Sequence, residues 1–196
     1  MQTYLGLRIK NFLFDAFDLL SFLVFVTWVV LFIRFFVFNP YTVVGQSMEP
    51  VFHQGDFIIV DKITPKFSSL QRGDVIVFVP RGKSVPYIKR IIGVPWETVK
   101  FKDNKVEICS ASGVCEILDE PYLDPNSKTT INACRVDEFV VEWTGYFVLG
   151  DNRDHSTDSR CCFGLACFDG ANYLVFGEDM IGKVALKLYP TIEQHR

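Results

Sequence analysis

Three short segments of this chain combine a hydroxyl, an amine and a dense set of charges in an order that suits acyl-transfer chemistry. The first, residues 45–50, reads Gly-Gln-Ser-Met-Glu-Pro and offers Ser47 as a nucleophile in a turn. The second, residues 87–95, reads Tyr-Ile-Lys-Arg-Ile-Ile-Gly-Val-Pro and carries Lys89. The third, residues 145–160, passes from an apolar strand-like run into a turn rich in charges and hydroxyls. Because a serine hydroxyl is a weak nucleophile until a nearby base takes its proton, the segments must also supply that base.

Lys89 can be the base only if its amine is uncharged for part of the time at working pH. On a strand, Tyr87, Lys89 and Ile91 share one face, which predicts largely apolar surroundings for the amine. Burial disfavours the charged form and lowers the pKa of an amine. A change from ~10.4 to about 7 corresponds to roughly 4.6 kcal/mol, which full desolvation can supply. Arg90 lies on the opposite face, where we expect it to extend along the surface with its charge in water.

A histidine could be the base instead. His155 lies in the third segment beside Asp151, Asp154 and Asp158. A Ser-His-Asp triad is defined by geometry and not by sequence order. The residues by themselves therefore leave the lysine pair and the histidine triad both open.

In this order, behind a single apolar segment, the three segments resemble the signature motifs of bacterial type I signal peptidases, which are membrane-bound serine proteases that use a Ser-Lys pair. The resemblance extends from about Asn39 to Pro190, and the motif Gly-Asp-Asn-Arg-x-x-Ser-x-Asp-Ser-Arg is complete at residues 150–160. It implies that Ser47 is the nucleophile and Lys89 the general base, with no metal and no organic cofactor.

The resemblance also implies roles for residues around this pair. Ser156 is expected to hydrogen-bond the Lys89 amine and to orient it. An ion pair between Asp158 and Arg160 is expected to fix this loop against the core. The remaining assignments are two supporting charges and three residues of a shallow apolar pocket for small substrate side chains: Asp151 and Arg153, and Tyr41, Val43 and Ile88.

Two positions depart from the family pattern. Val51 stands where the family commonly has threonine, which concerns a local hydrogen bond. Gly45 stands where some members have a serine hydroxyl that stabilises the oxyanion. The backbone N–H of Ser47 is one candidate donor for that oxyanion, and the second is open between a backbone group, a water and another side chain.

An apolar segment near the N-terminus predicts a membrane anchor. Residues 19–38, taken as a helix, would span ~30 Å, about the thickness of the hydrocarbon core. The alternative is a cleaved secretory signal, but bulky residues at positions 35–38 replace the small-residue cleavage site. The short basic N-terminus, residues 1–18, predicts a single pass with this end in the cytoplasm and the catalytic domain outside the bacterial cytoplasmic (inner) membrane.

Six cysteines in a domain predicted to lie outside the cytoplasm indicate disulfide bonds. Cys109 and Cys115 bracket a short loop that a bridge can close. A bridge from Cys167 to a neighbour, with Cys134 joined to the remaining cysteine, would use all six; the neighbours are Cys161 and Cys162. The alternative is a zinc site, which the lack of a Cys-x-x-Cys pair disfavours.

The sequence after the apolar segment predicts a mainly β fold. We expect a β-rich catalytic core with a small inserted β subdomain after the transmembrane helix. Short β-branched runs separated by turns predict the strands; the runs are 57–60, 75–79, 87–92, 98–102, 105–109 and 184–188. The catalytic segments lie in two stretches with a more polar one between them. We therefore expect a core from residues 39–95 and 145–190, an insertion of residues 96–144 and a tail of residues 191–196.

The combined prediction is a serine endopeptidase that removes signal peptides from translocated preproteins at the outer face of the membrane. Its expected partners are preproteins, membrane lipid and, by proximity, the secretion translocon. A net charge of −3 gives no sign of the basic face that nucleic acid requires. Two alternatives are a related Ser-Lys peptidase with a dedicated substrate and a non-catalytic anchored module that binds envelope partners.

Overall fold

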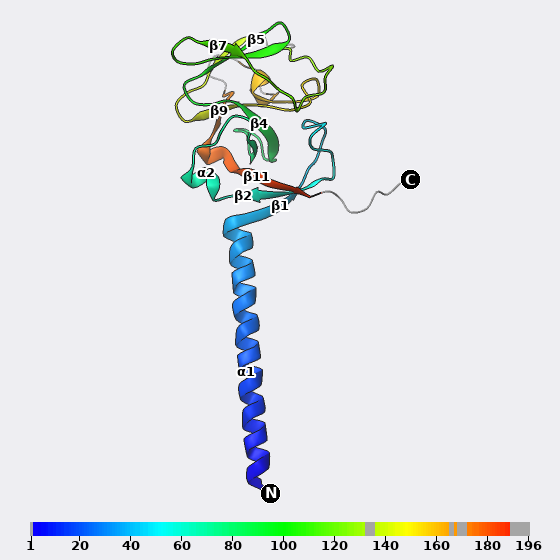
Figure 1. Cartoon of the computed structure of the whole chain (residues 1–196), viewed down its shortest axis with the longest axis vertical. Coiled ribbons are helices and arrows are strands. Elements are labelled where there is room, and N and C mark those ends of the chain that lie inside the picture. The colour runs from blue at the N-terminus through cyan, green and yellow to red at the C-terminus, as the bar shows by residue number, and fades with distance from the viewer. Residues whose placement is uncertain (1, 132–135, 165–166, 168–171, 189–196) are drawn as a thin grey trace, which may run out of the picture. The chain divides into compact units, whose positions relative to one another are not determined.

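The computed structural model describes residues 2–131, 136–164, 167 and 172–188 of the 196-residue chain. The chain divides into two compact units, Met1–Phe38 and Asn39–Arg196, which Figure 1 shows as a long helix and a β-rich unit. The predictions made for Cys134, for Pro190 and for residues 191–196 lie outside the described residues.

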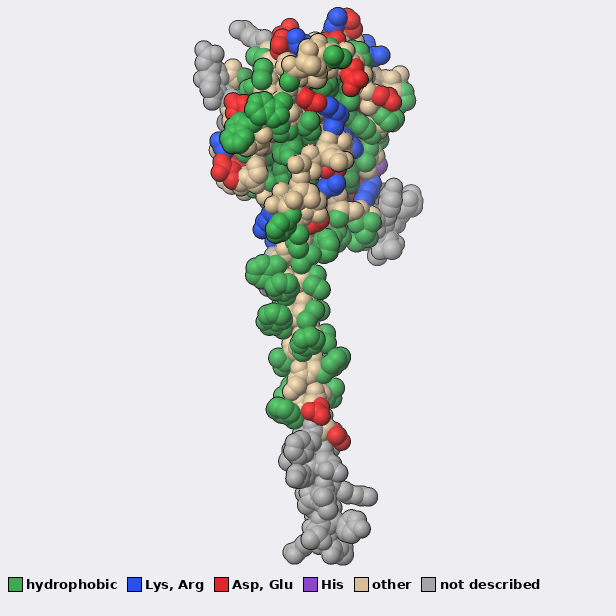
Figure 2. Space-filling model, turned by 60° about the vertical axis from the view of Figure 1, so that its left-hand side comes forward, with side chains coloured by type: hydrophobic (Ala, Val, Ile, Leu, Met, Phe, Trp, Pro, Cys, Tyr) green, Lys and Arg blue, Asp and Glu red, His purple; other side chains and the backbone are tan. Residues whose placement is uncertain are grey.

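The first unit is one continuous helical run. Helix α1 covers Gln2–Phe32 and continues as a π-helical segment, η1, over Ile33–Val37. Within it, the stretch Asp15–Phe32 has a mean hydropathy of 2.0 and is long and apolar enough to cross a membrane. Figure 2 shows hydrophobic side chains along the stretch Asp15–Phe32, and none of it is buried against protein. Such a surface requires an apolar surrounding, which a bilayer supplies.

The second unit contains a seven-stranded sheet in the order β1-β2-β11-β3-β4-β9-β10. Pro40 lies in β1 at the edge of this sheet, where a missing backbone donor is tolerated. The strands are β1 Phe38–Thr42, β2 Phe57–Asp61, β3 Val75–Phe78, β4 Tyr87–Gly93, β9 Gly145–Leu149, β10 Val175–Phe176 and β11 Met180–Leu188. The short helices of this unit are α2 Thr64–Phe67, η3 Ser159–Gly164 and η4 Gly177–Asp179.

A second, four-stranded sheet has the order β7-β6-β5-β8 and lies in the sequence between β4 and β9. Its β5–β6 hairpin turns at Asp103 and Asn104, whose φ angles of 51° and 62° are ones that Asp and Asn tolerate. Its strands are β5 Thr98–Lys102, β6 Lys105–Cys109, β7 Cys115–Ile117 and β8 Glu138–Val140. Together with the large sheet it confirms the mainly β fold class.

The two sheets share a hydrophobic core. Ile92 and Phe147 of the large sheet pack with Val99 and Phe139 of the small sheet in one buried cluster. Gly93 allows this close approach, because a Cβ there would lie 2.6 Å from Cγ2 of Val99. β4 and β9 also pair directly with each other; β4 carries Lys89, and the loop after β9 carries the third segment of the candidate site.

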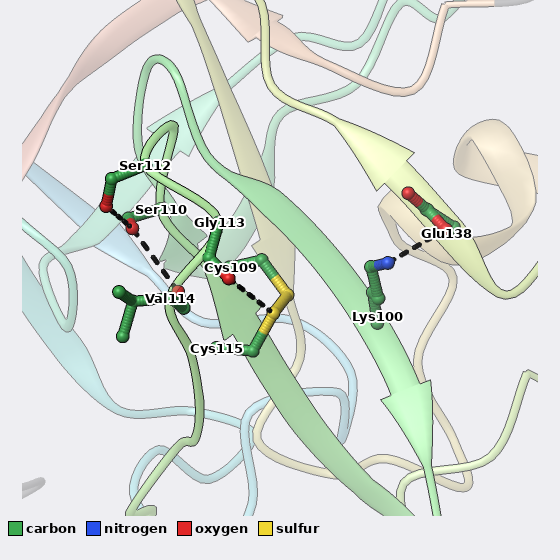
Figure 3. The surroundings of a disulfide bond; sticks show 8 residues. All are labelled: Lys100, Cys109, Ser110, Ser112, Gly113, Val114, Cys115 and Glu138. Carbon is green, nitrogen blue, oxygen red and sulfur yellow. Dashed lines mark hydrogen bonds and ion pairs between the residues drawn. A yellow bond between two sulfur atoms is a disulfide. The ribbon is translucent and has the colours of Figure 1, made fainter.

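Two of the predicted disulfide bonds are present. Cys109 is bonded to Cys115 where β6 meets β7, as Figure 3 shows. Cys167 is bonded to its neighbour Cys162. Among the described residues, Glu107 and the first of these pairs form the one group with metal-ligand spacing. The sulfurs of Cys109 and Cys115 are bonded to each other and so offer no thiolate to zinc.

Candidate active site

Ser47 lies in a compact turn, residues 43–56, which we call the Ser47 turn. Its two ends are joined by hydrogen bonds from Val43 N–H to the Asp56 carbonyl (2.8 Å) and from Gly55 N–H to the Val43 carbonyl (2.9 Å). Gly55 has a φ of 92°, which glycine adopts without steric cost. Met48 is buried in the core beneath the turn, so the hydroxyl beside it is presented from an anchored segment.

Lys89 brings its amine directly to this hydroxyl. Its Nζ lies 2.6 Å from the Oγ of Ser47 and 2.8 Å from the carbonyl oxygen of Ile88. Lys89 projects from β4, is only 3% exposed, and has the Tyr87 ring centroid 5.6 Å from its Nζ. The apolar surroundings predicted for the amine are therefore present.

The environment of Lys89 lowers the pKa of its amine. Burial lowers its pKa from 10.5 to about 8, against the attraction of Asp158 and Asp151 and with the help of Arg160. At neutral pH about a tenth of such a group is uncharged. A neutral amine 2.6 Å from a serine hydroxyl can accept its proton.

Ser156 does not make the predicted hydrogen bond to Lys89. Its Oγ is buried, and it has no hydrogen-bond partner among the described residues. The amine instead contacts the Ser47 hydroxyl and a carbonyl of its own strand. The Ser156 hydroxyl lies against Gly150, where an added Cβ would come within 2.2 Å of it.

Asp158 and Arg160 form a buried ion pair with two hydrogen bonds, each of 2.9 Å. The carboxylate of Asp158 also accepts a hydrogen bond from Gly150 N–H (3.1 Å). The Arg160 guanidinium donates to the backbone carbonyls of Arg153 (2.7 Å) and Thr130 (2.8 Å). The pair thus links parts of the loop after β9 to one another and joins this loop to the segment that follows β7.

The prediction for Arg90 is wrong. Its guanidinium donates two hydrogen bonds to the Asp151 carboxylate (2.8 and 2.6 Å) and one to the carbonyl of Gly73 (2.8 Å). It also lies 4.0 Å from the ring centroid of Tyr122. This face of β4 is covered by the loop after β9 and by the segment after β7, so an arginine there needs a partner carboxylate instead of water.

Arg153 has a partner that the sequence analysis missed. Its buried guanidinium pairs with both carboxylate oxygens of Glu120 and donates to the Thr129 hydroxyl. Glu120 also accepts a hydrogen bond from the Tyr122 hydroxyl (2.6 Å). The one available signal was that a buried arginine requires an acidic partner, and this does not say which of the chain's acids supplies it.

The histidine triad is not assembled in this structure. His155 is exposed, and its imidazole makes no hydrogen bond or ion pair within the part of the chain that the structure describes. Of the three candidate acids, Asp151 pairs with Arg90 and Asp158 with Arg160.

A groove of about 640 Å³ leads to the Ser47 hydroxyl and the Lys89 amine. Residues 41–47 line one part of it and residues 85–89 another, and His155 and Thr157 also contribute. All three residues predicted for the apolar pocket line this groove; they are Tyr41, Val43 and Ile88.

The family model and the sequence relatives agree with each other. The family described as "Signal peptidase, peptidase S26" matches residues 16–189. Signal peptidase I T of Bacillus subtilis (strain 168) is 36% identical over 160 residues, covering 74% of this chain and 77% of the relative. Signal peptidase IB of Staphylococcus aureus (strain N315) is 33% identical over 182 residues, covering 86% and 87%. A crystal structure of a signal peptidase I from Enterococcus faecalis V583 has a TM-score of 0.44 and 28% identity, over 60% of this chain and 98% of that one.

Proposed function

This chain belongs to the signal peptidase family, peptidase S26, and we propose that Ser47 and Lys89 are the catalytic pair of this serine endopeptidase. Its relatives are named signal peptidase I, and the reaction is the removal of signal peptides from preproteins. The observation that carries the proposal is the 2.6 Å contact between the Lys89 amine, whose pKa is lowered to about 8, and the Ser47 hydroxyl.

In the first half of the reaction, the neutral Lys89 amine takes the hydroxyl proton while Ser47 Oγ attacks the carbonyl carbon of the scissile bond. The oxygen of that carbonyl becomes negatively charged and needs donors. The Ser47 backbone N–H makes no hydrogen bond to any described residue and can serve as one. The Lys89 ammonium then gives its proton to the leaving amine, and an acyl-enzyme remains on Ser47.

In the second half, Lys89 takes a proton from the water that attacks the acyl-enzyme and returns it to Ser47. The Asp158–Arg160 pair holds the loop that carries Ser156, whose buried Oγ has no hydrogen-bond partner among the described residues.

The groove favours substrates with small side chains before the cleaved bond. Tyr41, Val43 and Ile88 give its walls an apolar character close to the hydroxyl. Asp151 and Arg153 take no part in binding, because their charges are paired with Arg90 and Glu120; they support the loop.

Helix α1 anchors the enzyme in the bacterial cytoplasmic membrane as a single pass, with its N-terminus in the cytoplasm. The catalytic unit then lies on the outer face, next to lipid and near the translocon that delivers preproteins. Disulfide bonds such as Cys109–Cys115 support a location of the catalytic unit outside the cytoplasm, because disulfides persist in oxidising compartments.

The test uses the detergent-solubilised full chain and a preprotein, with mass mapping of the new N-terminus. Ser47→Ala and Lys89→Ala should each abolish processing while the variants stay folded. Wild-type turnover by Lys89→Ala would refute the Ser-Lys pair. Loss of turnover in His155→Ala, with Lys89→Ala active, would favour the histidine triad. A panel of preproteins separates a general peptidase from one with a dedicated substrate.

A further inference from the structure

Lys187, at the far end of the chain from Ser47, is largely buried against the Ser47 turn. Its Nζ donates to the backbone carbonyl of Val51 (2.7 Å) and lies 2.8 Å from Oδ2 of Asp56. The same nitrogen is 5.4 Å from the ring centroid of Phe52. The Lys187 side chain is 16% exposed, so an ammonium that a strand lysine would normally keep in water is committed to this turn.

A bulge in β11 causes this orientation. Regular alternation over residues 184–188 would direct Leu186 and Leu188 to the covered face and Lys187 to solvent. The pairing of β11 with β2 shifts register between Val184 and Leu186. As a result Leu186 is 54% and Leu188 43% exposed, while Lys187 faces inward. A bulge of this kind re-aims side chains, and bulges are common next to active sites.

The group that Lys187 meets is itself central to the Ser47 turn. Asp56 is buried, and its carboxylate also accepts a hydrogen bond from His53 N–H (2.8 Å). Although burial acts to raise the pKa of the Asp56 carboxyl, the hydrogen bonds from Lys187 and His53 hold it below its usual value. The backbone carbonyl of Asp56 accepts the bond from Val43 N–H that joins the two ends of the turn.

We propose that Lys187 is a positioning residue for catalysis: it fixes the Ser47 turn to β11 and thereby holds the Ser47 hydroxyl against the Lys89 amine. The inference rests on the proposed roles of Ser47 and Lys89. Without Lys187, Asp56 is a buried carboxylate without its cation, and the Val51 carbonyl loses this donor. The turn then moves toward water, which separates the hydroxyl from the amine and admits solvent to Lys89.

The experiment measures preprotein processing by the full chain in detergent across a range of pH. In Lys187→Met, kcat should fall about tenfold to a hundredfold, because a displacement of about 1 Å can cost that much. KM should stay within about twofold, since most of the groove wall is unchanged. The acid limb of kcat/KM should move upward by on the order of half a pH unit or more, because a hydrated amine keeps its proton longer. The charges that face Lys89 (Asp158, Asp151 and Arg160) are unchanged in the variant, so the movement reports hydration.

Two further variants separate positioning from general stability. Lys187→Arg keeps a cation for Asp56 and should restore most of kcat. Lys183→Met is the matched control, because Lys183 lies on the same strand, is 34% exposed and pairs with Asp74 at 2.7 Å, away from the Ser47 turn. It should keep the wild-type kcat and acid limb.

The outcomes for Lys187 and for the proposed function can be told apart. Wild-type processing that does not need Ser47 and Lys89 would overturn the proposed function. Processing that needs both, with the same kcat and acid limb in Lys187→Met as in wild type, would overturn the role of Lys187 alone. If Lys187→Met does not fold, Asp56→Asn removes the same ion pair, and wild-type values for that variant would equally overturn the inference.

Discussion

Gly150 lies so close to the backbone of Ser47 that a Cβ on it would stand 2.4 Å from the Ser47 carbonyl oxygen. The next residue but one, Asn152, donates its backbone N–H to the same oxygen (3.1 Å). The loop after β9 therefore approaches the Ser47 turn at a point where no side chain fits. This contact joins two of the three segments that carry the chemistry.

Gly150→Ala should lower kcat at least about a hundredfold, because the methyl group must displace the Ser47 backbone and the Ser156 side chain, and so move the Ser47 hydroxyl relative to Lys89. The unfolding temperature should also fall, since overpacking typically costs about 1–3 kcal/mol. Gly177→Ala is the control, because a Cβ at Gly177 meets nothing within 4 Å. Unchanged processing by Gly150→Ala would show that this approach is not needed for activity.

The activity of the wild-type enzyme should increase with pH and level off above about pH 8. The reason is that only the neutral Lys89 amine can accept the Ser47 proton, and burial lowers its pKa to about 8. A profile of kcat/KM against pH measures this limb directly. His155→Gln should leave the limb in place, and its disappearance in that variant would assign the limb to the imidazole.

The free energy of unfolding should also depend on pH because of the lowered pKa of Lys89. Its pKa is about 8 in the folded protein against 10.5 as the ordinary value, so the unfolded chain binds more protons between these values. The Lys89 contribution to the free energy of unfolding therefore rises with pH from about 8 to 10.5, by about 3 kcal/mol in all.

Chemical denaturation of wild type and Lys89→Met from pH 7 to pH 10 measures the contribution of Lys89 to the free energy of unfolding. The methionine variant should be the more stable at pH 7, with the difference shrinking toward pH 10. A difference that stays constant over this range would contradict the lowered pKa.

Glu120→Ala should destabilise the protein by about 3–5 kcal/mol, because it leaves the buried Arg153 guanidinium without its carboxylate. The control is Glu178→Ala, which breaks an ion pair with Arg81 whose side chains are 74% and 48% exposed. That change should cost less than about 1 kcal/mol. Equal losses in the two variants, measured by urea denaturation, would show that the Glu120–Arg153 pair does not stabilise this fold.

Much of the strand content could be predicted from local pattern. The runs around Phe57, Val75, Tyr87, Thr98 and Lys105 became strands because their β-branched content and flanking turns are properties of neighbouring residues. The disulfide Cys109–Cys115 could be predicted in the same way, since few residues separate the pair, whereas the sequence left open whether Cys161 or Cys162 bonds to Cys167. The choice of Lys89 over a histidine as the partner of Ser47 rested on the resemblance of the three motifs to a known family, because the residues by themselves left both bases open.

The choice of long-range partners could not be predicted in this way. Arg90 binds Asp151, and Arg153 binds Glu120, because two sheets pack together and cover faces that a single strand would leave in water. Lys187 faces the Ser47 turn because one bulge reverses the alternation of its strand. The sequence by itself determined which residues have the chemistry and where many of the strands form, since both are local properties. The tertiary structure alone decided which charges are buried and what they meet, because that depends on how distant segments pack.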